Sequence, residues 1–195
     1  TFLVVDCGGG IVNLTMRALL SGNKLEKEPV VTGSLCGSTD VDQEFLDFMG
    51  RTVGFTALQR LRSYAYGDLQ KLVHRFFIET VMLPFTGDPD EFETIELDLK
   101  RYCPSLIKYT TGAERINLEN NEWIIELEFE TVTKMFDPVI GKIIELINNQ
   151  FKRVREMFQE RVPIIASPPQ QAATVVKGAV KYGLDMCQVE SRVLK

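Results

Sequence analysis

Three consecutive glycines, Gly8, Gly9 and Gly10, stand between two runs of β-forming residues near the start of the chain. Residues 2–6 form an apolar run, and residues 11–20 alternate well enough to return as an antiparallel strand. A third strand is predicted over residues 25–35. The sequence therefore predicts a small β-meander whose first turn is unusually rich in glycine.

A helical pattern follows the predicted meander. Apolar side chains recur near helical spacing over residues 40–82, where we expect two helices, with Asp40 as the N-cap of the first. Gly50 and Gly54 lie between the two apolar faces and mark the expected break. Prolines and glycines over residues 83–89 should end the second helix, because both residue types interrupt helices.

The second half of the chain predicts a strand and a long helix. Residues 88–100 are acidic, and a solvated loop or an edge strand suits them better than a Ca²⁺ loop, whose ligand spacing is absent. A strand is expected over residues 123–129. From Glu130 a helical pattern continues to about residue 161 without a C-cap, which predicts either one long helix or two helices that have lost the segment between them. The last predicted elements are a strand over residues 162–165 and a helix over residues 172–184.

Composition argues against several functional classes. The formal net charge is −5 and lysines and arginines do not cluster, so nucleic acid is not an expected partner. The four cysteines are scattered and His74 is the single histidine, which argues against a zinc site and makes a structural role for His74 the simpler interpretation. No signal peptide or long apolar span is present, so we expect a cytoplasmic protein without a membrane partner.

The glycine-rich turn is a candidate phosphate site. Consecutive glycines place backbone N–H groups where no Cβ blocks an anion, and Asp6 just before them could orient a Mg²⁺-bound water. A tight hairpin that uses glycine only for positive φ explains the turn equally well. A second small-residue turn, residues 36–40, opens a predicted helix whose N-terminus attracts anions, and it favours the phosphate interpretation. A Walker A loop is excluded, because the glycines lead into a strand and no Gly-Lys-Ser/Thr follows.

These segments resemble the seventy-kilodalton heat-shock chaperones of the actin-like ATPase superfamily, specifically their divergent twelve-type branch. Residues 4–15, VVDCGGGIVNLT, are similar to the second phosphate motif of that family, Asp-x-Gly-Gly-Gly-Thr-x-Asp. Residues 37–42, GSTDVD, resemble its Gly-Gly-Glu-Asp-Phe-Asp turn. Residues 83–87, LPFTG, resemble the segment after its adenosine-side helix, and residues 172–184 resemble the closing helix of the domain.

The resemblance implies an α/β fold of the α+β type, a ribonuclease-H-like lobe of an actin or heat-shock ATPase. Residues 1–195 would be lobe II, with residues 50–120 a mainly helical inserted subdomain and lobe I absent. ATP or ADP with Mg²⁺ would be the cofactor, and a client or co-chaperone protein a further partner. Asp6 would be the catalytic carboxylate, acting on Mg²⁺ through water, and the phosphate-binding residues would be Gly8, Gly9, Gly10, Gly37, Ser38 and Thr39.

Several positions depart from the family pattern. The threonine after the three glycines is Ile11, which has no hydroxyl, and the second aspartate is the neutral Asn13. Met82 stands where the family would have a lysine, and the adenosine turn has no counterpart, because residues 148–150 run straight into residues 151–153. These departures argue against hydrolysis and leave three interpretations: an ATP-binding chaperone fragment, a degenerate binding or regulatory module without turnover, and a truncated gene product.

Overall fold

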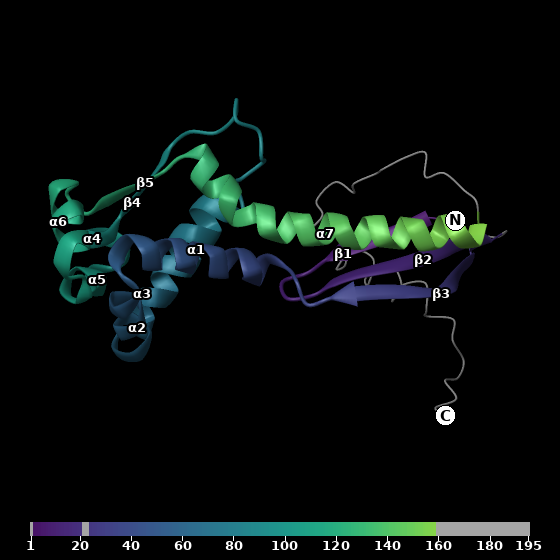
Figure 1. Ribbon diagram of the computed structural model, residues 1–195, viewed down its shortest axis with the longest axis horizontal. Helices are drawn as coiled ribbons and strands as arrows, with labels where there is room; N and C mark the ends of the chain where they lie inside the picture. The colour runs from purple at the N-terminus through teal and green to yellow at the C-terminus, as the bar shows by residue number, and fades with distance from the viewer. Residues whose placement is uncertain (1, 21–23, 159–195) are drawn as a thin grey trace, which may run out of the picture. The chain divides into compact units, whose positions relative to one another are not determined.

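The computed structural model describes residues 2–20 and 24–158, which combine helices with two small antiparallel sheets (Figure 1). This mixture agrees with the expected α+β class. By its internal contacts, Thr1–Met157 is one compact unit. The predictions for residues 162–165 and 172–184, including the closing helix, lie outside the described residues.

The predicted meander is confirmed. Its three strands pair antiparallel in the order β1-β2-β3, and the glycine turn connects the first two. Val12 and Leu14 of β2 are fully buried and form a small core with Cys36, which we call the meander core. The strands are β1 (Phe2–Cys7), β2 (Val12–Leu20) and β3 (Lys24–Ser34).

Four helical elements occupy the region where two helices were expected. Gly54 breaks the first helix with a φ of 90°, a left-handed value that favours glycine, whereas Gly50 lies inside that helix. A further break falls at Ala65, which has no glycine or proline signal. The elements are α1 (Ser38–Val53), α2 (Phe55–Tyr64), α3 (Tyr66–Gln70) and the π-helix η1 (Lys71–Met82).

The expected N-cap at Asp40 is wrong by three residues. Helix α1 begins at Ser38, so Gly37 is the N-cap and Asp40 lies in the first turn. The Asp40 carboxylate reaches back and accepts a hydrogen bond from the Gly37 N–H at 3.3 Å. An acidic side chain in the first turn also suits the positive end of the helix dipole. Asp40 therefore indicated the N-terminus of this helix correctly, although it is not the N-cap.

A two-stranded sheet and three short helices follow η1. The acidic segment is a loop up to Thr94 and then a strand, as predicted, and this strand pairs antiparallel with the strand expected near residue 125. Asp98 caps the next helix by accepting from the N–H groups of Lys100 and Arg101. The elements are β4 (Ile95–Asp98), α4 (Leu99–Tyr102), α5 (Pro104–Tyr109), α6 (Gly112–Asn120) and β5 (Ile124–Leu127).

These helices and the β4-β5 sheet share one larger hydrophobic core, which we call the helical core. Its centre is aromatic: Phe45 of α1 stacks on Phe77 of η1 with ring centroids 4.2 Å apart and planes 4° apart. The ring centroid of Phe76 lies 6.3 Å from that of Phe45, and both side chains are buried with Phe77. Phe85 is only partly buried and packs against other phenylalanines at the edge of this core.

The long helix is confirmed as α7 (Phe129–Phe158), 30 residues without interruption. Pro138 lies within it, and Figure 1 shows α7 changing direction in its first half, as a proline that removes a backbone hydrogen bond would produce. Ile143 packs against both the helical core and the meander core. Residues 148–150 are helical, so the segment where the family would have its adenosine turn is an unbroken helix here.

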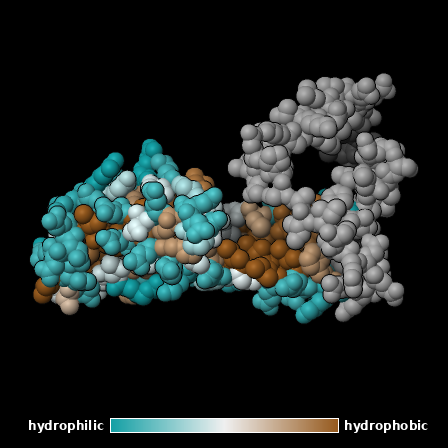
Figure 2. Space-filling model, turned by 90° about the horizontal axis from the view of Figure 1, so that it is seen from above, coloured by the Kyte–Doolittle hydropathy of each residue, from teal (hydrophilic) through white to brown (hydrophobic). Residues whose placement is uncertain are grey.

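Helix α7 also presents apolar side chains to solvent. Ile140 and Ile144 are 45% and 51% exposed, and Figure 2 shows hydrophobic surface beside the mainly hydrophilic surface of the helical region. Despite the length of α7, no helix within residues 2–20 and 24–158 is both long and apolar enough to span a membrane.

Candidate phosphate-binding site

The two glycine-containing turns lie in direct contact. The N–H of Thr39 and its hydroxyl both donate to the carbonyl oxygen of Gly9, at 2.8 and 2.9 Å. The Ser38 N–H donates to the carbonyl oxygen of Gly8 at 3.4 Å. The start of α1 is therefore fixed to the turn between β1 and β2, although 30 residues separate the bonded partners.

Gly37 makes this contact sterically possible. A Cβ at this position would overlap the carbonyl oxygens of Gly8 and Gly9 and would lie 2.7 Å from the Gly9 carbonyl carbon. The φ of Gly37 is 176°, an extended value that any residue adopts, so the backbone conformation does not require glycine. The close approach of the two turns requires it instead.

The contact decides which N–H groups remain for an anion. The Gly8 N–H donates to the Ile11 carbonyl oxygen at 2.9 Å, and the Thr39 N–H is engaged by Gly9. The N–H groups of Gly9, Gly10 and Ile11 have no acceptor within the described part of the chain. The exposed Ser38 hydroxyl likewise makes no hydrogen bond there. These three successive N–H groups, which we call the cradle, are therefore free to donate hydrogen bonds to an anion.

The strand register brings Asp6 beside Asn13. Asp6 pairs with Asn13 across β1 and β2, and Asn13 pairs with Gly33 across β2 and β3. Directly opposite residues point to the same face of a sheet, and Val12 and Leu14 point to the other face. The Asn13 Oδ1 would lie 3.0 Å from a Cβ at Gly33, so this glycine leaves room for the amide. The exposed Asp6 carboxylate and the Asn13 amide thus share one face at the glycine turn.

The departures from the family pattern occupy distinct environments. Ile11 is 48% exposed at the end of the glycine turn, where it presents a hydrocarbon surface. Met82 ends η1 and packs against the helical core, so it cannot stand in for a lysine that reaches a nucleotide. Among the residues that the structure describes, no group of three or more His, Cys, Asp or Glu side chains is arranged to hold a metal ion.

Asp42 is a partly buried acidic group that the sequence indicated only as part of a motif. It lies in α1, and its Oδ1 is buried without a hydrogen-bond partner. Burial raises the pKa of this carboxyl above its ordinary value of 3.8, and the nearby His74 of η1 opposes the shift. His74 itself is exposed. A carboxylate with one buried, unsatisfied oxygen is a destabilising feature at neutral pH.

We expect Asp42→Asn to raise the melting temperature at pH 7. A carboxyl whose pKa is raised on folding binds its proton more tightly in the folded state, so its favourable contribution exists at low pH and is lost as the pH rises through the folded pKa. The advantage of Asp42→Asn should therefore shrink as the pH falls toward 3.8. Thermal melts at several pH values test this, with the exposed Asp137→Asn as control. A lower melting temperature for Asp42→Asn at pH 7 would refute it.

Comparisons with known proteins support a distant relationship with the 70 kDa heat-shock class of actin-like ATPases. The similar proteins are heat shock 70 kDa protein 12A of Mus musculus and of Homo sapiens, each 22% identical to this chain. The alignments cover 98% of this chain and 33% of each relative, so the chain spans about a third of the length of the curated relatives it matches. The 229 aligned positions exceed the 195 residues of the chain, so these relatives contain residues that have no counterpart here. No family model matches the chain.

Proposed function

We propose that this chain binds the phosphate groups of ATP or ADP as lobe II of a heat-shock-type ATPase domain. The observation that carries the proposal is the contact between the two glycine turns, which leaves the N–H groups of Gly9, Gly10 and Ile11 unbonded beside Asp6. The distant similarity to heat shock 70 kDa protein 12A supports the same class of ligand. Under this proposal residues 50–120 are the inserted helical subdomain, and a client or co-chaperone in the cytoplasm would be the protein partner.

Each group at the turn has a distinct task in this proposal. The three N–H groups bind phosphate oxygens, and Ser38 contributes its exposed hydroxyl. The Asp6 carboxylate would hold a water molecule bound to Mg²⁺. Mg²⁺, when bound with the nucleotide, would neutralise phosphate charge. The residues fit a phosphate well and fit the metal less well, because Asn13 supplies a neutral amide where a second carboxylate would attract the cation.

Binding without efficient hydrolysis is the form of this function that the residues favour. Ile11 cannot donate a hydroxyl to the phosphate, and Asn13 cannot take up a proton from water as a carboxylate could. The unbroken α7 favours the related alternative of a degenerate binding or regulatory module, because helix occupies the place of the adenosine turn. Both alternatives retain the phosphate cradle and differ in whether the adenosine is recognised.

Calorimetric titrations of the purified chain with Mg-ATP, tripolyphosphate and adenosine separate these alternatives. We expect Mg-ATP and tripolyphosphate to bind with similar dissociation constants, weaker than about 1 μM because one lobe cannot enclose a nucleotide. Adenosine alone should not bind. A sub-micromolar Mg-ATP affinity would exclude the degenerate module, and failure of both phosphate ligands to bind would refute the cradle.

The double variant Ile11→Thr with Asn13→Asp should bind Mg-ATP about tenfold more tightly, because the added hydroxyl can donate a hydrogen bond to the phosphate and the added carboxylate can attract the phosphate-bound Mg²⁺. Ile11→Val with Asn13 unchanged is the matched control, since valine has the shape of threonine without its hydroxyl. The measurement is the same titration, with a thermal melt to confirm that each variant folds. An unchanged dissociation constant for the double variant would mean that the turn is only structural.

A further inference from the structure

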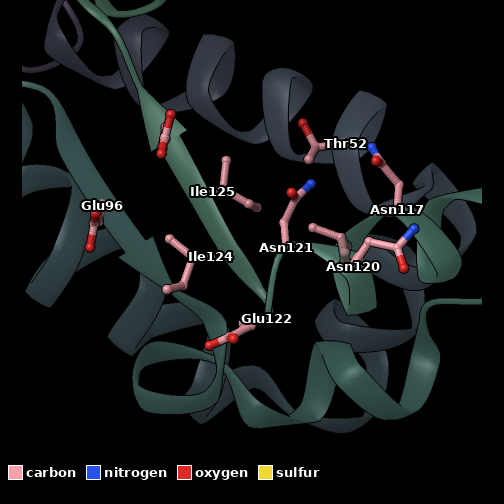
Figure 3. Close-up of a pocket in the computed structure, with 10 residues that line it drawn as sticks. Thr52, Glu96, Asn117, Asn120, Asn121, Glu122, Ile124 and Ile125 are labelled. Carbon is pink, nitrogen blue, oxygen red and sulfur yellow. The ribbon is translucent and has the colours of Figure 1, made fainter.

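A cavity of about 460 Å³ lies away from the glycine turns, between α1, α6 and β5 (Figure 3). Thr52 of α1 contributes to one wall, and Ile124 and Ile125 of β5 to another. Leu118 of α6 is a third apolar lining residue, and the lining contains no lysine or arginine. It includes three glutamates and three asparagines, Glu96, Glu122, Glu126, Asn117, Asn120 and Asn121.

One edge of β5 is unpaired along this cavity. Sheet β4-β5 has two strands, so each strand has one edge without a partner among the described residues. Figure 3 shows β5 with Glu96 on one side and Thr52 and Asn117 on the other. Consecutive side chains of a strand point to opposite faces, and both Ile124 and Ile125 line the cavity, so the cavity borders the edge of β5 that faces away from β4.

The hydrogen-bond pattern identifies which backbone groups point toward that edge. The Leu99 N–H donates to the carbonyl oxygen of Trp123 at 3.0 Å, which extends the register of β4 and β5 by one position. Opposite pairs in an antiparallel ladder alternate between hydrogen-bonded and non-hydrogen-bonded pairs. The backbone N–H and C=O of Ile125 therefore point toward β4, whereas those of Ile124 and Glu126 point toward the free edge. The outward N–H of Ile124 is taken by the carbonyl oxygen of Asn121 at 2.8 Å. The N–H and C=O of Glu126 and the C=O of Ile124 have no partner among the described residues.

The charged residues that line this cavity are all glutamates. Glu96 and Glu126 are directly opposite each other in the register of β4 and β5, so their carboxylates share one face of the sheet. Like charges in this position repel and destabilise a strand pair, and a cation between them would remove the cost. Glu122 adds a third exposed carboxylate at the start of β5. The asparagine amides can both donate and accept hydrogen bonds on the opposite wall.

We propose that this cavity binds an extended, lysine- or arginine-containing peptide segment of a partner protein, which adds a strand to the free edge of β5. The Glu126 N–H and C=O supply the backbone hydrogen bonds of strand addition. Basic side chains at alternate peptide positions reach one face and there meet Glu96 and Glu126. A small cation would satisfy the carboxylates and leave the backbone groups unbonded. This inference does not depend on nucleotide binding.

The probe is a blocked pentapeptide of alternating valine and lysine, titrated against the full chain by calorimetry and by amide NMR. We expect binding, with a shift and slowed hydrogen exchange of the Glu126 amide. The same peptide with N-methylated backbone amides should bind about tenfold more weakly, because it cannot donate to the strand edge. A valine–glutamate peptide should not bind. Spermidine binding as tightly as the lysine peptide would overturn the proposal in favour of a simple cation site.

Charge-neutral variants test the role of the carboxylates. Glu96→Gln with Glu126→Gln should weaken the lysine peptide about tenfold, since each lost ionic hydrogen bond is replaced by a neutral one. This variant removes a repulsion, so it should melt no lower than the wild type, and reduced binding cannot be assigned to unfolding. Glu93→Gln is the control, because Glu93 is exposed near β4 but does not line the cavity. The proposal would be refuted if the double variant bound the lysine peptide as tightly as the Glu93→Gln control, or if the wild type did not bind the peptide.

Discussion

Gly37→Ala is expected to force apart the two glycine turns and to remove phosphate binding. Its Cβ would overlap the carbonyl oxygens of Gly8 and Gly9, which are backbone atoms and cannot turn away as a side chain would. Overpacking of this kind typically costs about 1–3 kcal/mol of folding free energy. Displacing the turn also breaks the hydrogen bonds from Thr39 to Gly9 that fix its shape. We expect tripolyphosphate affinity to fall more than about tenfold, in line with the loss of several hydrogen bonds to an anion.

Gly67→Ala is the matched control for this experiment. A Cβ at Gly67 meets nothing within 4 Å, and alanine has the higher helix propensity in α3, so stability should stay equal or rise by up to about 1 kcal/mol. Urea denaturation and the tripolyphosphate titration are measured on both variants. Wild-type stability in Gly37→Ala would contradict the contact between the turns. Lower stability with unchanged tripolyphosphate affinity would preserve the contact and contradict the phosphate site.

Local sequence pattern predicted the strands well because the meander depends on local signals. Alternating side chains define each strand, and the glycines at residues 8–10 can only lie in a turn between them. The long helix was also predictable, since Pro138 interrupts one backbone hydrogen bond but leaves the apolar face continuous. The number of helices over residues 40–82 was not predictable, because Ala65, which ends α2, is neither glycine nor proline. The π-helical winding of η1 does not follow the spacing that helix patterns assume.

The sequence identified the residues of the candidate site, but it did not predict how they are arranged in space. Each glycine turn has its own local signal, but the hydrogen bonds between Thr39 and Gly9 join segments far apart in sequence. This contact uses the Thr39 N–H that the sequence suggested for phosphate, and leaves those of Gly10 and Ile11 unbonded. The cross-strand pair of Glu96 and Glu126 is similarly non-local, so the sequence alone does not show that Glu96 of the acidic segment lines a cavity with Glu126.

Phe45→Ala should be the most destabilising single substitution in the helical core. The Phe45 side chain is fully buried, and its ring stacks on Phe77 at 4.2 Å. Replacing a buried phenylalanine by alanine costs about 3–5 kcal/mol through lost burial and the cavity left behind. The stacked pair adds an aromatic contribution that alanine cannot make. Phe55→Ala is the control, because Phe55 is 58% exposed and its loss should cost far less. Equal urea midpoints for the two variants would contradict the packing.

The same variant tests whether the two cores unfold together. Helix α1 carries Phe45 in the helical core and begins beside Cys36 of the meander core, and α7 contacts both cores through Ile143. These two continuous helices transmit a loss of packing in one core to the other, so we expect Phe45→Ala to retain a single cooperative transition. Fluorescence of Trp123 in the helical core should therefore report the same urea midpoint as the amide exchange of Val12 and Leu14 in the meander core. Different midpoints would show that the meander and its glycine turn fold independently of the helical core.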